Sequence, residues 1–227
     1  MPAALRDRLY LTGTDTGAGK TLASAAVLHA LGKKGLHAVG MKPVASGCAR
    51  TGEGWRNEDA LALQAAGMPG IPYSDINPYA FPEPLAPELA ARAAGVELHL
   101  APILEAYARL QAQSQFVVVE GVGGWAAPLS GQLDQCDLVR ALRLPVVLVV
   151  GLRLGCLNHA RLSAAAIVAD GCELVGWIAS EVDPDMACRE ENLALLEARL
   201  PVPCWGHLPY QADPQPQHLA DRLKLPL

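Results

Sequence analysis

Residues 9–21, with the sequence LYLTGTDTGAGKT, constrain most strongly what this chain can fold into. An apolar, strand-like run passes through a glycine-rich turn into a helix-forming segment that begins at Lys20. Several backbone N–H groups must point at a bound triphosphate, so the loop around it can carry little side-chain bulk. Gly17 and Gly19 supply that freedom, and the start of the following helix adds its positive dipole end. The stretch therefore predicts a phosphate-binding loop.

This loop matches the P-loop pattern with one departure. In the pattern the lysine reaches the β- and γ-phosphates and the next hydroxyl holds Mg²⁺, roles that fall here on Lys20 and Thr21. The pattern has a glycine five residues before its second glycine, where this chain has Thr14, and Gly13 lies one residue too early. We expect the polar residues 14–16, Thr-Asp-Thr, to face the substrate.

The bulk properties favour one domain, residues 1–227, with an irregular C-terminal edge at 211–227. A net charge of −5 without a basic stripe argues against a nucleic-acid partner. The longest apolar run, 144–152, is shorter than the ~18 residues of a membrane span. The polar residues 1–8 lead into the first strand without an apolar signal core, so we expect a cytoplasmic protein with no membrane partner.

The cysteines and histidines do not indicate a zinc site or a disulfide framework. No Cys-x-x-Cys or Cys/His pairing is present, and the six histidines are dispersed. We expect the cysteines to be small buried side chains; they are Cys48, Cys136, Cys156, Cys172, Cys188 and Cys204.

Runs of Val, Ile and Leu alternate with longer helix-like segments, a pattern typical of α/β proteins with a mainly parallel β-sheet and helices on both faces. The near-continuous apolar stretches 117–119 and 146–150 indicate strands covered on both sides. The predicted strands are 9–12, 37–41, 116–120, 145–150 and 174–179. The predicted helices are 20–34, 58–66, 87–94, 101–112, 134–142, 157–169 and 186–200.

The proline-rich stretch 68–87 is predicted to be an ordered surface loop rather than a disordered linker. Interleaved large apolar side chains would pack the loop on itself; they are Ile71, Tyr73, Ile76, Tyr79 and Phe81.

Polar residues directly after the predicted strands are the candidates for chemistry, because ligands collect beyond the carboxyl ends of strands in open α/β sheets. Lys42 follows the second strand and suits an anion, although a surface lysine is the alternative. Glu120 ends the strand 116–120, where a carboxylate suits Mg²⁺. Asp59 opens a helix, where it would also complement the helix dipole. Together Thr21, Glu120 and Asp59 would supply hard oxygen ligands for one Mg²⁺.

Five motifs in order resemble those of the dethiobiotin synthetase family, over residues 9 to about 210. They are GTDTxxGKT at 13–21, KPVASG at 42–47, RNxDA at 56–60, EGxGGW at 120–125 and LGCLNH at 154–159. The resemblance implies a P-loop NTPase fold and a homodimer. It also implies closure of the ureido ring of dethiobiotin from 7,8-diaminopelargonic acid, CO₂ and ATP with Mg²⁺.

By this resemblance, two sets of residues bind the co-substrates. Nucleotide contacts would come from Thr14, Asp15, Thr16, Gly17, Ala18, Gly19, Lys20, Thr21, Asp59, Glu120, Gly121, Val122 and Gly123. Substrate contacts would come from Thr16, Lys42, Ser46, Gly155, Cys156, Leu157 and Asn158, the last four across the dimer interface. Lys42 and Lys20 would be catalytic, stabilising charge on the carbamate and the transferred phosphoryl group.

The chain departs from the family at the expected base contact. Where members commonly have Asn-Asp, it has Ser180-Glu181, so a relaxed nucleotide preference is expected because a hydroxyl pairs with fewer base atoms than an amide does. His207, Leu208 and Pro209 would flank the base through their backbone. A tyrosine that some members place near the substrate carboxylate aligns with Asn192.

Two other classes of protein share parts of this pattern. One is an amide-forming ATP enzyme acting on a corrinoid precursor, but those enzymes usually carry a glutaminase domain for which this chain has no room. The other is a partition or positioning ATPase, but such proteins usually have a lysine at the position of Asp15. A dethiobiotin synthetase is therefore the favoured hypothesis.

Overall fold

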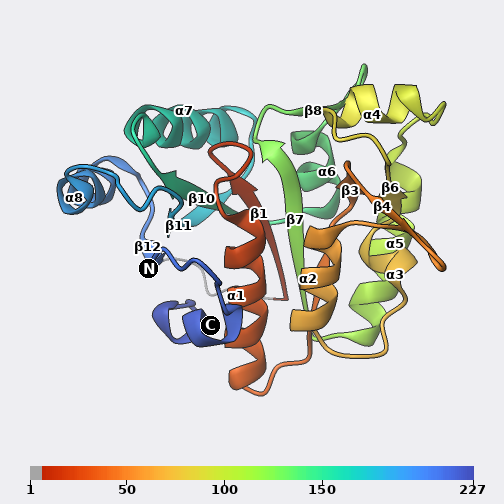
Figure 1. The fold of residues 1–227 in the computed structure, drawn as a ribbon, viewed down its shortest axis with the longest axis horizontal. Helices are drawn as coiled ribbons and strands as arrows, with labels where there is room; N and C mark the ends of the chain where they lie inside the picture. The colour runs from red at the N-terminus through yellow and green to blue at the C-terminus, as the bar shows by residue number, and fades with distance from the viewer. Residues whose placement is uncertain (1–6) are drawn as a thin grey trace.

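A six-stranded sheet runs through the centre of the structure, a computed structural model that describes residues 7–227 (Figure 1). The strand order is β12-β11-β10-β1-β7-β2, and every neighbouring pair is parallel. The first six residues, part of the segment judged to lack a signal core, lie outside the described residues. The strands are β1 (Arg8–Gly13), β2 (Ala38–Met41), β7 (Phe116–Gly124), β10 (Val146–Leu152), β11 (Leu174–Glu181) and β12 (Cys204–Leu208).

All the predicted helices and strands are confirmed within a few residues. The helices over the sheet are α1 (Lys20–Lys33), α2 (Glu58–Ala66), α4 (Pro87–Ala93), α5 (Leu100–Gln113), α6 (Gln135–Leu142), α7 (Cys156–Ala169) and α8 (Arg189–Arg199). The strand β12 was not predicted, because its five residues include Gly206 and His207 and lack a run of β-branched side chains.

The sheet buries both of its faces, as its apolar strands require. In β1, Tyr10 faces a core built with α5, α6, α7 and α8, whereas Leu9 and Leu11 face a core built with α1. The short C-terminal helix α9 (Pro216–Leu219) and the 3₁₀ turn η1 (Ala220–Arg222) also cover this second core. Figure 1 shows α7 and α1 in separate layers with the strands between them.

Short two-stranded sheets lie in the connections near the carboxyl ends of β2 and β7. They are β3 (Val44–Ala45) with β6 (Tyr79–Ala80), β4 (Ala49–Thr51) with β5 (Gly54–Arg56), and β8 (Pro128–Ser130) with β9 (Leu133–Asp134). None of these two- or three-residue strands has enough sequence to show alternation, which explains why they were not predicted.

The proline-rich stretch is ordered, as predicted, but it is not packed only on itself. It contains the one-turn helix α3 (Tyr73–Ile76) and the strand β6. Ile71, Ile76 and Phe81 are buried in the same core as Val39 and Met41 of β2. The stretch is therefore an integral part of the domain core beside an edge strand.

The expectation that the cysteines are buried is only partly correct. Cys48, Cys156 and Cys172 are buried, Cys136 and Cys204 are half-buried, and Cys188 is exposed at the start of α8. All six thiols are free.

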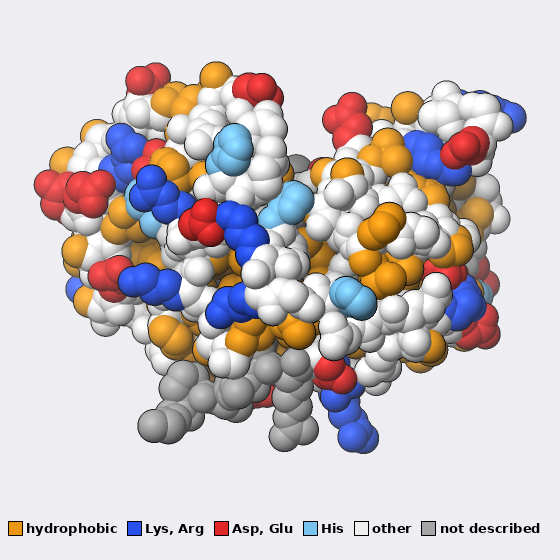
Figure 2. Space-filling model, turned by 90° about the horizontal axis from the view of Figure 1, so that it is seen from below, with side chains coloured by type: hydrophobic (Ala, Val, Ile, Leu, Met, Phe, Trp, Pro, Cys, Tyr) orange, Lys and Arg blue, Asp and Glu red, His pale blue; other side chains and the backbone are white. Residues whose placement is uncertain are grey.

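No helix of the described part of the chain is long and apolar enough to cross a membrane. Figure 2 shows the end of the molecule opposite the carboxyl ends of the central strands. On this face basic and acidic side chains are interspersed among apolar ones. Among the described residues on this face, the basic side chains do not line up in a stripe of the kind that binds a phosphate backbone.

Two glycine substitutions test the packing of β11 against β12. A Cβ at Gly176 would lie 2.2 Å from Nε1 of the buried Trp205, so we expect Gly176→Ala to cost about 1–3 kcal/mol of unfolding free energy through overpacking. In contrast, a Cβ at Gly32 meets open space near the end of α1, and Gly32→Ala should gain up to about 1 kcal/mol. Urea denaturation measures both; equal stability of the two variants would contradict this packing.

Candidate active site

A cleft of ≈ 750 Å³ opens at the carboxyl ends of β1, β2 and β7. The P-loop, the segment after β2, the start of α2 and the loop after β7 all contribute to its wall. Its lining includes the predicted residues Thr16, Gly17, Gly19, Lys20, Thr21, Lys42, Ser46, Asp59, Val122 and Gly123. Chain segments separated by about a hundred residues thus meet at one edge of the sheet, the place where the topology predicts a ligand.

The P-loop has the backbone conformation that its glycines predict. Gly17 has φ 70° and Gly19 has φ 83°, both in the left-handed region that favours glycine, and α1 begins at the next residue. A Cβ at Gly19 would also lie 2.2 Å from the hydroxyl of Ser180. The loop is therefore free of side-chain bulk where the N–H groups of the helix start are available to a phosphate.

The prediction that residues 14–16 all face the substrate is wrong for two of them. The Thr14 hydroxyl accepts the Gly151 N–H at 3.3 Å, and the Asp15 carboxylate pairs with Arg153 at 2.6 Å. Only Thr16 lines the cleft. Thr14 and Asp15, where the loop departs from the standard pattern, therefore attach it to β10 and to Arg153 directly after β10. No local sequence pattern indicated this role.

Lys42 lies at the centre of a buried charge cluster. Its side chain is 4% exposed, and its ammonium group lies 2.6 Å from Oε1 of Glu120 and 3.2 Å from Oδ2 of Asp59. The ammonium also donates to the Gly121 carbonyl at 3.0 Å. The alternative of a surface lysine is thereby excluded, and Asp59 is not merely a charge at the helix start.

For Lys42 and Asp59, the neighbouring charges together shift the pKa more than burial does. Burial alone would lower the pKa of Lys42, but the charges of Glu120 and Asp59 raise it above its ordinary value. For Asp59, burial would raise the pKa, but the nearby positive charge of Lys42, followed by that of Lys20, lowers it. Lys42 is therefore a permanent cation and Asp59 a permanent anion near neutral pH.

Thr21, Asp59 and Glu120 fit a hydrated Mg²⁺ ion. The Thr21 hydroxyl donates to Oε1 of Glu120 at 2.9 Å, and Oε2 of Glu120 is buried without a partner among the described residues. Such an orphaned carboxylate oxygen suits a cation. Within residues 7–227 no group of three or more His, Cys, Asp or Glu side chains is placed so that it could hold a metal ion by itself. Two carboxylates and a hydroxyl match Mg²⁺, which usually keeps several waters and binds phosphates as well.

Lys20 is the more weakly held cation of the site. Its ammonium donates to the Asp15 carbonyl at 2.9 Å. Burial, followed by the positive charge of Lys42, lowers the pKa of Lys20 to about 8, against the opposing pull of Glu120, Asp59 and Asp15. A bound triphosphate would supply the anionic partner that Lys20 lacks.

The carboxyl end of β7 is held by residues that the sequence analysis missed. Gln135, at the start of α6, donates to the Gly124 carbonyl at 2.6 Å and accepts from the Val122 N–H at 3.0 Å. The buried Tyr10 hydroxyl donates to the same glutamine at 2.7 Å. This contact spans 125 residues of sequence, so no local pattern could have indicated it.

Other residues of the cleft were missed as well. Asn57 lines the cleft and caps α2 by accepting the Ala60 N–H at 3.2 Å. Its Asn-Glu-Asp context is a helix-start signal that could have identified it. Residues 84–87, at the start of α4, also line the cleft. Their prolines and apolar side chains gave no indication of a binding role.

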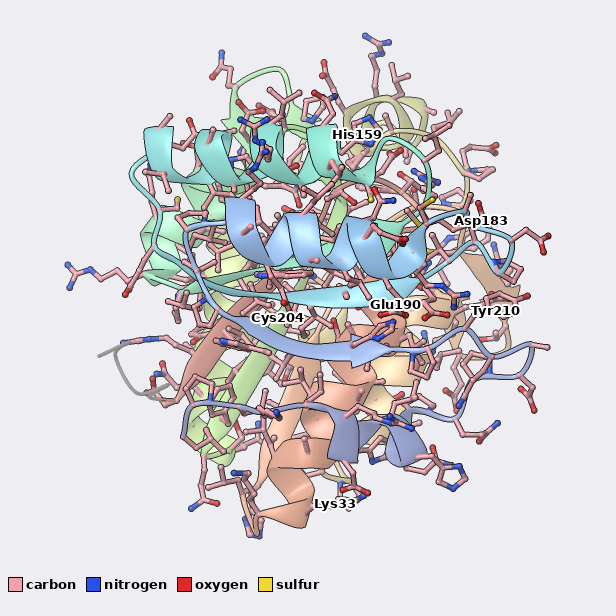
Figure 3. All side chains as sticks on the ribbon, turned by 90° about the vertical axis from the view of Figure 1, so that its left-hand side faces the viewer. Lys33, His159, Asp183, Glu190, Cys204 and Tyr210 are labelled. Atoms are coloured by element: carbon pink, nitrogen blue, oxygen red, sulfur yellow. The ribbon has the colours of Figure 1, made fainter. Side chains whose placement is uncertain are left out.

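The predicted base-contact residues lie beside the P-loop but do not line this cleft. Ser180 contacts Gly19, and the Glu181 carboxylate binds Arg189 at 2.6 Å, His207 at 2.7 Å and the Tyr210 N–H at 3.0 Å. Leu208 ends β12 and is buried, and Pro209 follows it. Figure 3 shows Glu190 and Tyr210 at the same end of β12, remote from Cys204 at its start. Glu181 thus ties together three segments at the tips of β11 and β12.

The predicted carboxylate-binding segment, Gly155 to Asn158, also lies outside the cleft. It forms the first turn of α7, after the loop that carries Arg153. The side chain of Cys156 is buried and its N–H donates to the Arg153 carbonyl at 3.0 Å, so Cys156 itself is already engaged. Asn158 borders a separate surface cavity of ≈ 720 Å³ along α7. Within one chain this segment does not meet Lys42 in a common cleft.

A parallel α/β sheet with a glycine-rich loop opening a helix, two lysines and two carboxylates defines a P-loop nucleotide-binding protein. Solved structures agree on the fold. The signal recognition particle receptor FtsY from Elizabethkingia anophelis matches with a TM-score of 0.52 and 16% identity, over 97% of this chain and 66% of that chain. Chloroplast FtsY from Physcomitrella patens matches with a TM-score of 0.51 at 16% identity, over 97% and 65%.

Sequence comparison narrows the class. A family profile described as an AAA domain matches residues 7–218. The ATP-dependent dethiobiotin synthetase BioD of Xanthomonas oryzae pv. oryzae (strain PXO99A) is 65% identical over 217 residues, 96% of this chain and 97% of that protein. Its counterpart in Xylella fastidiosa (strain 9a5c) is 64% identical over 201 residues, 88% and 89%. The chain belongs to the ATP-dependent dethiobiotin synthetase family.

The lowered pKa of Lys20 predicts how nucleotide binding depends on pH. Below pH 8 the amine is charged both in the free protein and beside a phosphate, so the affinity should be level. Above pH 8 the free amine must take up a proton on binding, and the affinity for ADP should fall by up to about tenfold per pH unit. Calorimetry with ADP in a chelating buffer measures this fall together with the proton uptake.

The variant Lys20→Arg is the control, because arginine stays charged throughout this range. Its affinity should be level from pH 7 to pH 9.5, whatever its absolute value. The same slope in both proteins would assign the pH dependence to another group.

Proposed function

We propose that this chain is an ATP-dependent dethiobiotin synthetase, a ligase of biotin biosynthesis. It closes the ureido ring of dethiobiotin from 7,8-diaminopelargonic acid, CO₂ and ATP, releasing ADP and phosphate. The proposal is carried by the buried Lys42 between Glu120 and Asp59 beside a P-loop, in a chain that is 65% identical to a synthetase of that name. A cleft of ≈ 750 Å³ has room for a substrate and the terminal phosphates of a nucleotide.

Different groups of residues are proposed to bind the nucleotide and the diamine substrate. The P-loop, residues 14–20, and Thr21 bind the triphosphate, with the backbone of residues 121–123 on the opposite wall. Thr16 and Ser46 line the cleft and hydrogen-bond the diamine and its carbamate. Lys42 belongs to the buried charge cluster and also lines the cleft. Its ammonium is therefore proposed to contact both the nucleotide and the substrate.

The reaction needs positioning and charge stabilisation rather than a protein nucleophile. One substrate amine adds to CO₂ and loses a proton to give a carbamate, whose oxygen attacks the γ-phosphorus as ADP leaves. The second amine then attacks the carbonyl of this carbamic-phosphoric anhydride, so that the second C–N bond forms and phosphate departs. Lys20 and Lys42 stabilise the anionic oxygens in both steps, from positions fixed before the substrates arrive.

Thr21, Asp59 and Glu120 would hold the Mg²⁺ ion of this reaction. When bound, the ion would supply positive charge that offsets the negative charge of the phosphates. Asp59 and Glu120 also pair with Lys42, and Glu120 accepts a hydrogen bond from the Thr21 hydroxyl in the first turn of α1.

The substrate's distal carboxylate is proposed to bind at the start of α7. N–H groups in the first turn of a helix have no intrahelical partner and favour an anion. Because Gly155, Leu157 and Asn158 lie outside the cleft of their own chain, they would serve the site of a second subunit, so the enzyme acts as a homodimer. We further propose that it works in the cytoplasm.

The nucleobase is proposed to lie against Ser180 and the backbone of residues 207–209. Glu181 is already paired with both Arg189 and His207, and the Ser180 side chain has a single hydroxyl. We therefore expect turnover with GTP or CTP within about tenfold of turnover with ATP. Initial rates with the three triphosphates measure this, and strict dependence on ATP would contradict it.

The function is tested by combining the purified protein with 7,8-diaminopelargonic acid, bicarbonate, Mg²⁺ and ATP. Mass spectrometry should detect the cyclic urea, and phosphate release should require the diamine and bicarbonate together. Phosphate release without the diamine, and no cyclic product, would refute the proposal.

The two lysines should each be required for the rate. We expect Lys42→Ala and Lys20→Ala each to lower kcat about 10²-fold or more, the scale on which one preorganised charge-stabilising group acts. Lys42→Ala also leaves Glu120 buried without its cation, which costs about 3–5 kcal/mol of stability. Circular dichroism must therefore accompany its kinetics, whereas Lys20→Ala should stay close to wild-type stability. Near-normal turnover in either folded variant would contradict the assignment.

A further inference from the structure

The backbone of Lys42 is held in place by the proline-rich segment rather than by the central sheet. The strand β2 is at the edge of the sheet, and its pairing with β7 ends at Met41. Beyond that point the Lys42 N–H donates to the Ile76 carbonyl at 2.7 Å, and the Lys42 carbonyl accepts from the Asn77 side chain, also at 2.7 Å. Both backbone groups of Lys42 are therefore bonded to the end of α3.

The same segment holds the start of the helix that carries Asp59. The Tyr73 hydroxyl donates to Oδ1 of Asn77 at 3.0 Å and accepts the Asn57 N–H at 2.8 Å. Asn57 is the N-cap of α2 and also donates to the Ser46 carbonyl at 3.3 Å. One chain of hydrogen bonds thus runs from the backbone of Lys42, through Asn77 and Tyr73, to Asn57.

This network of hydrogen bonds is buried at Asn57 and Asn77 and half-buried at Tyr73. Asn77 is 3% exposed, and its second amide hydrogen goes to the Tyr79 carbonyl at 3.0 Å. The ring of Tyr73 lies under the Arg56 guanidinium, 4.2 Å from its centre, which restricts the ring further. A satisfied network of this kind, buried at Asn57 and Asn77, specifies one geometry, since each group that loses its partner costs free energy.

We propose that Tyr73 and Asn77 are positioning residues that set the distance between Lys42 and Asp59. Asp59 lies two residues after Asn57, and its carboxylate is 3.2 Å from the Lys42 ammonium. Asn77 fixes the backbone of Lys42, and Tyr73 joins that anchor to the start of α2. Neither side chain lines the cleft, so both act through the residues they hold. This inference rests on the roles proposed above for Lys42 and Asp59.

The variant Tyr73→Phe removes only the hydroxyl and keeps the ring beneath Arg56. Lys42 keeps its bonds to Ile76 and Asn77, whereas the start of α2 loses its link to them. Loss of a group that orients a metal ligand typically costs 10- to 100-fold in metal affinity or activity. We expect kcat to fall at least tenfold with the KM for ATP within twofold, and the affinity for Mn²⁺ in the presence of ADP to fall about tenfold.

Tyr79→Phe is the matched control within the same segment. Its hydroxyl contacts the backbone of His99, accepting from the N–H and donating to the carbonyl, each at 3.2 Å, away from Lys42. This variant should behave like the wild type in kcat and in Mn²⁺ binding measured by electron paramagnetic resonance. Equal effects of the two substitutions would reduce Tyr73 to a general packing role and overturn the proposal.

Two further measurements separate positioning from loss of fold. Hydrogen exchange of the free protein should show lost protection at the Asn57 amide in Tyr73→Phe, with the rest of α2 unchanged. In an Asp59→Asn background, Tyr73→Phe should lower kcat less than twofold, because the residue it positions is already impaired. A full tenfold loss in that background would contradict the proposal. Absence of product from the wild type would instead refute the proposed function.

Discussion

The buried ion pair between Lys42 and Glu120 is the interaction on which the rest of the site depends. Two charges withdrawn from water are stable only when they satisfy one another and their remaining hydrogen-bonding groups. Here Lys42 also binds Asp59 and the Gly121 carbonyl, and Glu120 also binds Thr21. One oxygen of Glu120 remains without a partner in the described part of the chain, and this oxygen supports the proposal that the cluster binds a metal ion.

The topology of the sheet explains why this cluster forms at all. Lys42 follows β2 and the P-loop follows β1, while Glu120 lies within β7 between these two strands, and their parallel arrangement brings all three to one edge. Asp59 comes from the first turn of α2, which packs outside the sheet. Since β2 is an edge strand, its far side needs a separate support, and α3 with the following loop supplies it through Asn77 and Tyr73.

Much of this arrangement was predictable from local sequence patterns. Apolar runs indicated five of the six sheet strands, and the Gly-Lys-Thr sequence placed the phosphate-binding loop at the start of α1. The polar residues that end strands identified Lys42 and Glu120. What could not be predicted depends on contacts between distant segments: the Asp15–Arg153 pair, the Tyr10–Gln135 contact and the Tyr73 network. The strand β12 escaped because propensity is weak in five residues that include a glycine.

The central claim is that Thr21, Asp59 and Glu120 form a metal site, and that Lys42 holds the two carboxylates of this site in place beside the phosphates. A crystal structure of the protein with Mg²⁺, ADP and aluminium fluoride tests it most directly. The account predicts one octahedral Mg²⁺ with the Thr21 hydroxyl about 2.1 Å away, the Asp59 and Glu120 carboxylates bound directly or through one water, and the Lys42 ammonium on the fluoride group. A metal bound elsewhere, with Glu120 still enclosed by Lys42 alone, would contradict it.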